Sequence, residues 1–221
     1  MAKIQIHRAG LKVSASDSEI EAISRRFQRR QALVLESFLE PGLLAQVQDA
    51  AASAQFAPRR YDHVGSELCM TGESLAVQML LLLTNSPQLF GLVQRITRCP
   101  QVGYFDGRIY RIPPGPASLD QWHRDLTDGR QVAMSINLGA EPYQGGLFEL
   151  RKGGKSLFRV ANTGPGDALI FRIRHDLEHR VTAVGGTAPK TAFAGWFLDQ
   201  NRRQAYLGFF RGRVSSKIVR C

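Results

Sequence analysis

Three side chains, His123, Asp125 and His179, have the chemical types and the spacing to bind one metal ion. Alternate side chains of an extended strand share a face, so His123 and Asp125 are predicted to point the same way, about 7 Å apart at their Cα atoms. An imidazole and a carboxylate placed in this way can take two neighbouring positions on a metal. His179, on a distant strand, is predicted to complete the set.

A set of two histidines and one carboxylate on one side of a metal leaves the other side open, which is typical of non-haem Fe(II) oxygenases. Neutral imidazoles suit Fe(II), and a single carboxylate leaves net positive charge for an anionic further ligand. A His-x-Asp pair alone is common by chance. The interpretation therefore depends on the elements that position it.

Those elements are predicted strands separated by turns rich in proline and glycine. The strands are expected within residues 102–112, with a bend at Asp106-Gly107, and at 132–138, 147–150, 168–171, 179–181 and 190–197. Residues 113–121 form a loop that leads to His123. Residues 181–184, a turn at Gly185-Gly186 and the run from Lys190 are predicted to form a hairpin, which would bring Lys190 within about 7 Å of His179.

The first hundred residues are predicted to be mostly helical support. Helices are expected after the capping box Ser16-x-x-Glu19, from Pro41, across residues 74–84, and after Ser86-Pro87. Residues 32–35 are predicted to form a buried strand, whereas residues 56–72 are expected to be irregular. The helices should brace one sheet from outside.

In order and spacing, residues 104–200 resemble the 2-oxoglutarate-dependent Fe(II) dioxygenases, in particular the prolyl-4-hydroxylase-like branch. The resemblance implies a mainly β fold with flanking helices. This is a double-stranded β-helix, a jelly-roll or cupin-like barrel, braced by N-terminal α-helices. We expect one domain over residues 1–221, with helical support in 1–100, the catalytic barrel in 101–200 and a basic segment in 201–221.

The resemblance also implies the cofactors. Fe(II) would be held by His123, Asp125 and His179, with 2-oxoglutarate as co-substrate, O2 as oxidant and ascorbate as a further candidate. The distal carboxylate of 2-oxoglutarate then needs a cation about ten residues after the second histidine. Lys190, eleven residues after His179, is the candidate, although arginine is more usual in the family.

In the resembling family, a hydroxyl side chain two residues after that cation often helps to bind the co-substrate. Here that position is Ala192. Tyr110 and Ser135 are the alternative donors, and the sequence does not choose between them. Halogenases of the resembling family lack the carboxylate ligand, whereas this chain keeps Asp125, so hydroxylation is the expected reaction. The expected target is an aliphatic C–H bond of an amino acid or a peptidyl residue, with succinate and CO2 as co-products. Desaturation and ring formation stay open.

Two other functions compete with this interpretation. A cupin-type metal dioxygenase would work without 2-oxoglutarate, but cupins favour a His-x-His opening and have no need of Lys190. A non-catalytic jelly-roll module, for example one that binds nucleic acid, would gain nothing from keeping three metal ligands.

Composition adds weaker expectations. The net charge of the 221 residues is +10, but the arginines are dispersed, so a nucleic-acid partner is not favoured and a small-molecule or peptide substrate is expected. No apolar run reaches a membrane span or a signal peptide. Three widely spaced cysteines fit a cytoplasmic protein with reduced thiols. The oligomeric state cannot be read from the sequence.

Overall fold

The computed structural model describes residues 3–62, 64–72, 74–116, 120–127, 129–161 and 163–199. The predicted basic segment 201–221 lies outside the described residues. Within these described ranges strands dominate and four helices flank them, which confirms the predicted mainly β class.

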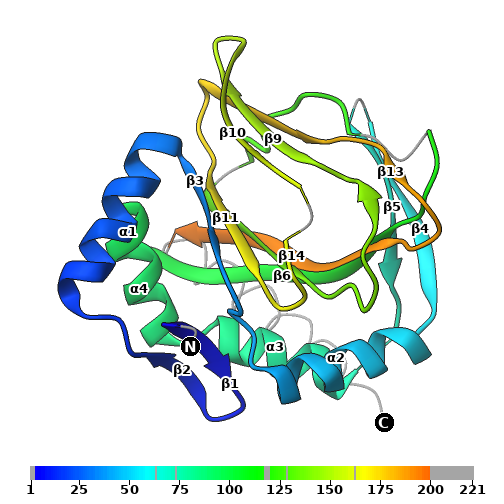
Figure 1. The fold of residues 1–221 in the computed structure, drawn as a ribbon, viewed down its shortest axis with the longest axis horizontal. Helices are drawn as coiled ribbons and strands as arrows, with labels where there is room; N and C mark the ends of the chain where they lie inside the picture. Colours follow the sequence, from blue (N-terminus) through cyan, green and yellow to red (C-terminus); the bar gives the residue numbers. More distant parts are fainter. Residues whose placement is uncertain are drawn as a thin grey trace, which may run out of the picture.

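Two antiparallel sheets face each other and form the barrel (Figure 1). The larger one has seven strands in the order β3-β11-β7-β14-β6-β5-β4. Their bounds are β3 Ala32–Leu35, β4 Phe56–Tyr61, β5 Gly65–Met70, β6 Val102–Ile112, β7 Arg130–Asn137, β11 Ala168–Arg172 and β14 Lys190–Asp199. β14 lies at the centre, where it pairs with β7 on one side and β6 on the other.

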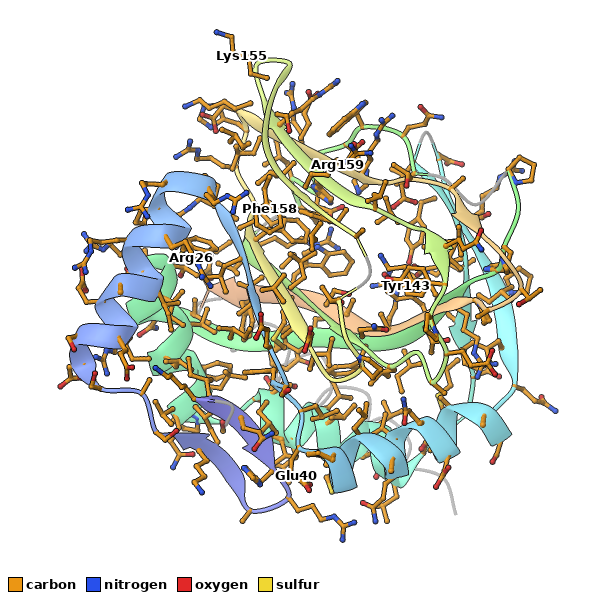
Figure 2. All side chains as sticks on the ribbon, viewed as in Figure 1. Arg26, Glu40, Tyr143, Lys155, Phe158 and Arg159 are labelled. Atoms are coloured by element: carbon orange, nitrogen blue, oxygen red, sulfur yellow. The ribbon has the colours of Figure 1, made fainter. Side chains whose placement is uncertain are left out.

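The smaller sheet has the order β10-β9-β12, and a two-stranded pair, β13-β8, closes one end of the barrel. The bounds are β8 Gln144–Gly145, β9 Phe148–Lys152, β10 Lys155–Val160, β12 Leu177–Val181 and β13 Val184–Gly185. Figure 2 shows Phe158 turned into the space between the sheets, while Lys155 stands at the tip of the β9–β10 hairpin. Phe158 packs there with Phe148 and Phe171, so the two sheets share an apolar interior at this end.

The helices cover the outer face of the larger sheet (Figure 1). They are α1 Asp17–Arg30, α2 Pro41–Ser53, α3 Leu75–Thr84 and α4 Pro87–Thr97, and a small hairpin of β1 Ile4–His7 and β2 Gly10–Val13 lies beside them. Beneath them three fully buried rings, Phe105, Phe193 and Phe197, pack with centroids 4.7 and 5.7 Å apart. None of the described helices is by itself long and apolar enough to cross a membrane; α3 and α4 together pass that test, with a 55° bend between them.

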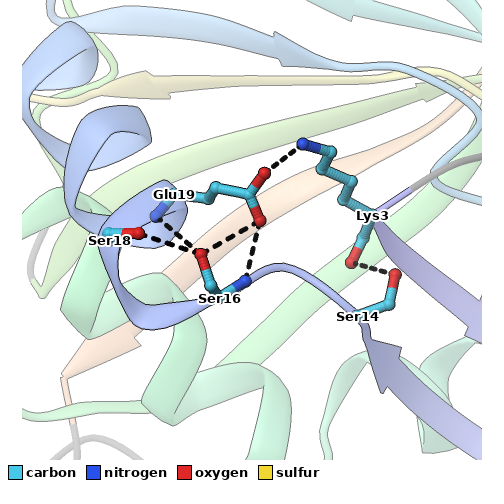
Figure 3. Close-up of polar contacts among 5 residues, drawn as sticks. All are labelled: Lys3, Ser14, Ser16, Ser18 and Glu19. Atoms are coloured by element: carbon cyan, nitrogen blue, oxygen red, sulfur yellow. Dashed lines mark hydrogen bonds and ion pairs between the residues drawn. The ribbon is translucent and has the colours of Figure 1, made fainter.

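The predicted capping box begins α1 (Figure 3). The Glu19 N–H donates to the Ser16 side chain, and the Ser16 N–H donates to the Glu19 carboxylate at 2.8 Å. Glu19 also pairs with Lys3, the residue before β1. Because these contacts satisfy N–H groups that a helix start leaves unpaired, they fix where α1 begins.

Two sequence-based expectations about strands were wrong. Residues 56–70 are not irregular: β4 and β5 form a hairpin, and β5 joins the large sheet through Leu68 and Cys69. The Asp106-Gly107 pair does not bend the chain, because β6 continues through it against β14. Gly107 lies opposite Gly195, where a Cβ would come within 1.9 Å of the Asp106 carbonyl oxygen, so the glycines allow close strand approach instead of a turn.

Candidate metal centre

The three predicted ligands meet at one point inside the barrel. His123 forms an isolated antiparallel bridge with His179 of β12, in which each N–H donates to the other residue's carbonyl oxygen, at 3.1 and 2.9 Å. The Nε2 atoms of His123 and His179 lie 3.6 and 3.4 Å from the two carboxylate oxygens of Asp125. One ligand atom from each residue lies within 4.8 Å of the others. This donor set fits a metal ion with one carboxylate and two imidazole ligands.

The predicted reason for this convergence was wrong. Asp125 is not in a strand that alternates with His123; its φ of 51° lies in the left-handed region. Aspartate tolerates this conformation better than most residues. The turn at Asp125, and not the period of a strand, therefore directs the carboxylate back toward the imidazoles.

Hydrogen bonds and burial set the protonation states of the three ligand side chains. The Nδ1 of His123 lies 2.8 Å from the carbonyl oxygen of Gln121. Because a carbonyl only accepts, Nδ1 carries the proton and the lone pair of Nε2 faces Asp125. Burial lowers the pKa of His179, which favours the neutral form that can bind a metal. Burial also opposes ionisation of Asp125, but its interactions with His179, His123 and Trp196 outweigh this and hold the carboxyl pKa well below its usual range.

Trp196 of β14 fixes the orientation of the carboxylate. Its Nε1–H donates to Oδ2 of Asp125 at 2.8 Å.

We expect Trp196→Phe to weaken binding of Co(II), used as a probe of the site, by about 10- to 100-fold, as for other groups that orient a metal ligand. Calorimetric titration measures this. Trp122→Phe is the matched control, because Trp122 contacts the guanidinium groups of Arg151 and Arg180, whose Cζ atoms lie 4.0 and 4.6 Å from its ring centre. An equal loss in both variants would contradict the assignment.

Lys190, Tyr110 and Ser135 line the same cavity as the triad. Lys190 begins β14; its side chain is buried, its Nζ donates to the Gly146 carbonyl at 3.4 Å and it lies 5.9 Å from the Tyr143 ring centre. Burial lowers the pKa of Lys190 to about 8, which the charge of Asp120 partly opposes. A buried amine without a carboxylate in ion-pair range, among the described residues, suits an anionic ligand.

The predicted hairpin between residues 181 and 197 was wrong. β12 belongs to the small sheet and β14 to the large one, and β13 between them pairs with β8. Lys190 therefore approaches the triad from the opposite wall of the barrel. Tyr110 of β6 pairs with Ala192, and Ser135 of β7 pairs with Ala194, so both hydroxyl candidates flank β14. Burial raises the pKa of Tyr110, which keeps its hydroxyl protonated.

Sequence reasoning missed several polar residues of the cavity, which has a volume of about 330 Å³. They are Arg108, Asp120, Arg130 and Trp196. Burial raises the pKa of Asp120 to about 6. Asp120 and Arg130 lie in loops or at a strand end, where no periodic pattern marks them. A signal existed only for Arg108 and Trp196, because their even spacing along β6 and β14 places them on the same faces as Tyr110 and Lys190.

Comparison with known proteins agrees with this geometry. Residues 109–198 match the family model described as the 2OG-Fe(II) oxygenase superfamily. The match covers 90 of the 221 residues, and over this segment the chain is similar to the superfamily. The matched family implies a 2-oxoglutarate-dependent dioxygenase with Fe(II) and 2-oxoglutarate as cofactor and co-substrate, and the triad supplies a fitting donor set for the metal. No protein in the curated set matches the sequence significantly.

Solved structures share the fold at low sequence identity. A Pseudomonas putida prolyl-4-hydroxylase has a TM-score of 0.62 and 18% identity, over 82% of this chain and 99% of that one. A Trichoplax adhaerens prolyl hydroxylase, in complex with a peptide fragment of hypoxia inducible factor, has a TM-score of 0.62 and 16% identity, over 85% and 94%. The α-ketoglutarate-dependent epimerase SnoN from nogalamycin biosynthesis has a TM-score of 0.62 and 13% identity, over 83% and 84%. These neighbours confirm the predicted double-stranded β-helix.

Proposed function

We propose that this dioxygenase hydroxylates an aliphatic C–H bond of an amino acid, free or within a peptide. His123, Asp125 and His179 would hold Fe(II), and the Lys190 amine would bind the distal carboxylate of 2-oxoglutarate. When bound, Fe(II) supplies the site at which O2 is reduced. One oxygen atom of O2 enters the C–H bond as hydroxyl, and the other enters succinate as 2-oxoglutarate loses CO2.

The presence of Asp125 in the triad is the observation that carries the proposal. Its carboxylate lies within reach of both imidazoles and accepts a hydrogen bond from Trp196, so the third ligand position is filled by the protein. A halide-transferring site would leave that position free. Cavity residues contribute binding and orientation: Lys190 positions the co-substrate, and Tyr110 or Ser135 adds a hydroxyl donor to the same anion.

The competing functions lack comparable support. A dioxygenase without 2-oxoglutarate has no use for a buried lysine in the cavity of the triad, and burying an amine without a counter-ion is unfavourable unless an anion binds it. The arginines behind the net charge of +10 are dispersed over the sequence and form no basic stripe interleaved with aromatic residues, which does not favour a nucleic-acid substrate. The cytoplasmic location and the use of ascorbate stay predictions, and ascorbate is tested by its omission from the assay.

The test is to incubate iron-loaded protein with 2-oxoglutarate and panels of amino acids, peptides and methylated oligonucleotides. We expect a mass gain of about 16 on an amino acid or a peptide, the mass of one inserted oxygen atom, together with equimolar succinate. Omission of iron or 2-oxoglutarate is the control and should abolish both products. Formaldehyde released from methylated oligonucleotides alone would overturn the proposal.

A further inference from the structure

The cavity carries two cations beyond the one proposed for 2-oxoglutarate, Arg108 and Arg130. Arg130, the first residue of β7, lines it near Trp196. Lys190 and Trp196 lie on the same face of β14 and are six residues apart, which corresponds to about 20 Å along the strand. Trp196 contacts both Arg130 and Asp125, so Arg130 lies at the triad end of β14, whereas Lys190 lies at the other end of this strand.

Arg130 and its neighbour Arg108 differ in how closely a carboxylate of the protein contacts the guanidinium group. Arg108 contacts the Glu67 carboxylate through Nε at 2.7 Å and through a terminal nitrogen at 2.6 Å, and Glu67 also accepts from the Tyr61 hydroxyl. The charge of Arg108 is therefore paired with a carboxylate of the protein. Arg130, in contrast, lies within 4.0 Å of one carboxylate among the described residues, Asp125 at 3.9 Å.

Stacking holds the Arg130 guanidinium in a fixed plane. Its Cζ lies 3.5 Å from the ring centre of Trp196, and the tryptophan in turn donates to Asp125. A guanidinium stacked on a ring keeps its N–H edges free for a ligand in the same plane. Asp106 of β6 acts on this charge from beyond ion-pair distance and does not line the cavity.

The position of Arg130 defines which part of a substrate it would contact. It lies 3.9 Å from Oδ1 of Asp125, an atom that belongs to the proposed metal-binding set. An anion held by Arg130 would therefore lie directly beside the reacting centre. Arginine binds a carboxylate with two parallel hydrogen bonds, and a residue inside a peptide has a neutral amide where a free amino acid has this carboxylate.

We propose that Arg130 binds the carboxylate of the prime substrate, which is a small free carboxylic acid of the amino-acid class oxidised at a carbon close to its acid group. This inference rests on the proposed function and narrows it. Arg130 would decide between a free acid and the same residue within a chain, because a neutral amide cannot form the bidentate ion pair that a carboxylate forms with the guanidinium.

The test compares free L-amino acids with their own carboxamides and with short peptides. Wild-type iron-loaded protein should oxidise at least one free acid with kcat/KM roughly tenfold or more above its amide, the discrimination expected from one charge-assisted pair. In Arg130→Gln this preference should fall to near unity, and Arg130→Lys should restore part of it. Arg124→Gln is the matched control, since Arg124 is half-exposed, pairs with Glu178 and does not line the cavity.

A further readout distinguishes binding of the substrate carboxylate from structural support of Asp125. In Arg130→Gln the Co(II) affinity should stay within about twofold of wild type, which corresponds to only ~0.4 kcal/mol. A matching loss of Co(II) affinity would instead assign Arg130 to the support of Asp125 and overturn the proposal. It is also overturned if no free acid is preferred over its amide. Absence of any succinate, even from wild-type protein, would refute the proposed function itself.

Discussion

Replacement of either triad histidine, in His123→Ala or His179→Ala, is expected to abolish metal binding and succinate formation together. The three ligand atoms lie within 4.8 Å of one another, so each substitution leaves one imidazole and one carboxylate. Two ligands hold Fe(II) far more weakly than three, because each lost ligand returns a coordination position to water. Titration with Co(II) measures binding, and 2-oxoglutarate decarboxylation measures turnover.

The two variants differ in what else they disturb. His179 is buried against Phe148 and Phe171, with ring centres 6.0 and 4.6 Å away, so its truncation also opens a cavity and lowers the unfolding temperature. His123 is only partly buried, so His123→Ala tests the ligand role with little loss of packing. His175→Ala, at an exposed histidine outside the cavity, is the control. Undiminished succinate formation by either triad variant would show that the substituted histidine is not a metal ligand.

The convergence of the site was predictable from residue types, whereas its local geometry was not. Two histidines and one aspartate at these positions indicate a metal site because few other roles need that donor set. However, the sequence assigned His123 and Asp125 to a strand, and the structure places Asp125 in a left-handed turn. A single residue that departs from a regular conformation leaves no periodic pattern, so it cannot be read from spacing.

The strands that carry buried residues were predictable for a related reason. β7, β11 and β14 bury most of their side chains, and such apolar runs are visible in the sequence. The β4–β5 hairpin was missed because β4 is mostly exposed and contains Pro58, Arg59 and Arg60. It is held by backbone pairing at the edge of the sheet, and backbone hydrogen bonds depend little on side-chain type.

Lys190 lies in the same cavity as His179, as predicted, although the hairpin from which this was predicted does not form. A local hairpin was expected to bring it near His179, and the chain instead crosses from the small sheet to the large one after β13. Which sheet a strand joins depends on pairing between distant segments, and a local pattern does not encode this. Arg130 was overlooked because its importance comes from Trp196, 66 residues later in the sequence.

Lys190→Ala is expected to raise the KM for 2-oxoglutarate by roughly 10- to 150-fold, since a charge-assisted hydrogen bond is worth about 1.5–3 kcal/mol. Lys190→Met, which keeps the length of the side chain without its charge, should give a similar increase and shows that the effect is not due to an empty space. Co(II) affinity should be unchanged in both variants. An unchanged KM would require another cation for the distal carboxylate.

The pH dependence of co-substrate binding tests the same residue by a different property. Because burial lowers the pKa of Lys190 from 10.5 to about 8, the free enzyme loses this charge as the pH rises through 8, and affinity for 2-oxoglutarate should fall there. The unfolded chain keeps its proton up to about 10.4, so Lys190 makes the free protein more stable with rising pH between these values. Lys190→Met should lose both trends, since it has no proton to exchange. Equal pH profiles of wild type and Lys190→Met would show that the amine does not bind the co-substrate in its charged form.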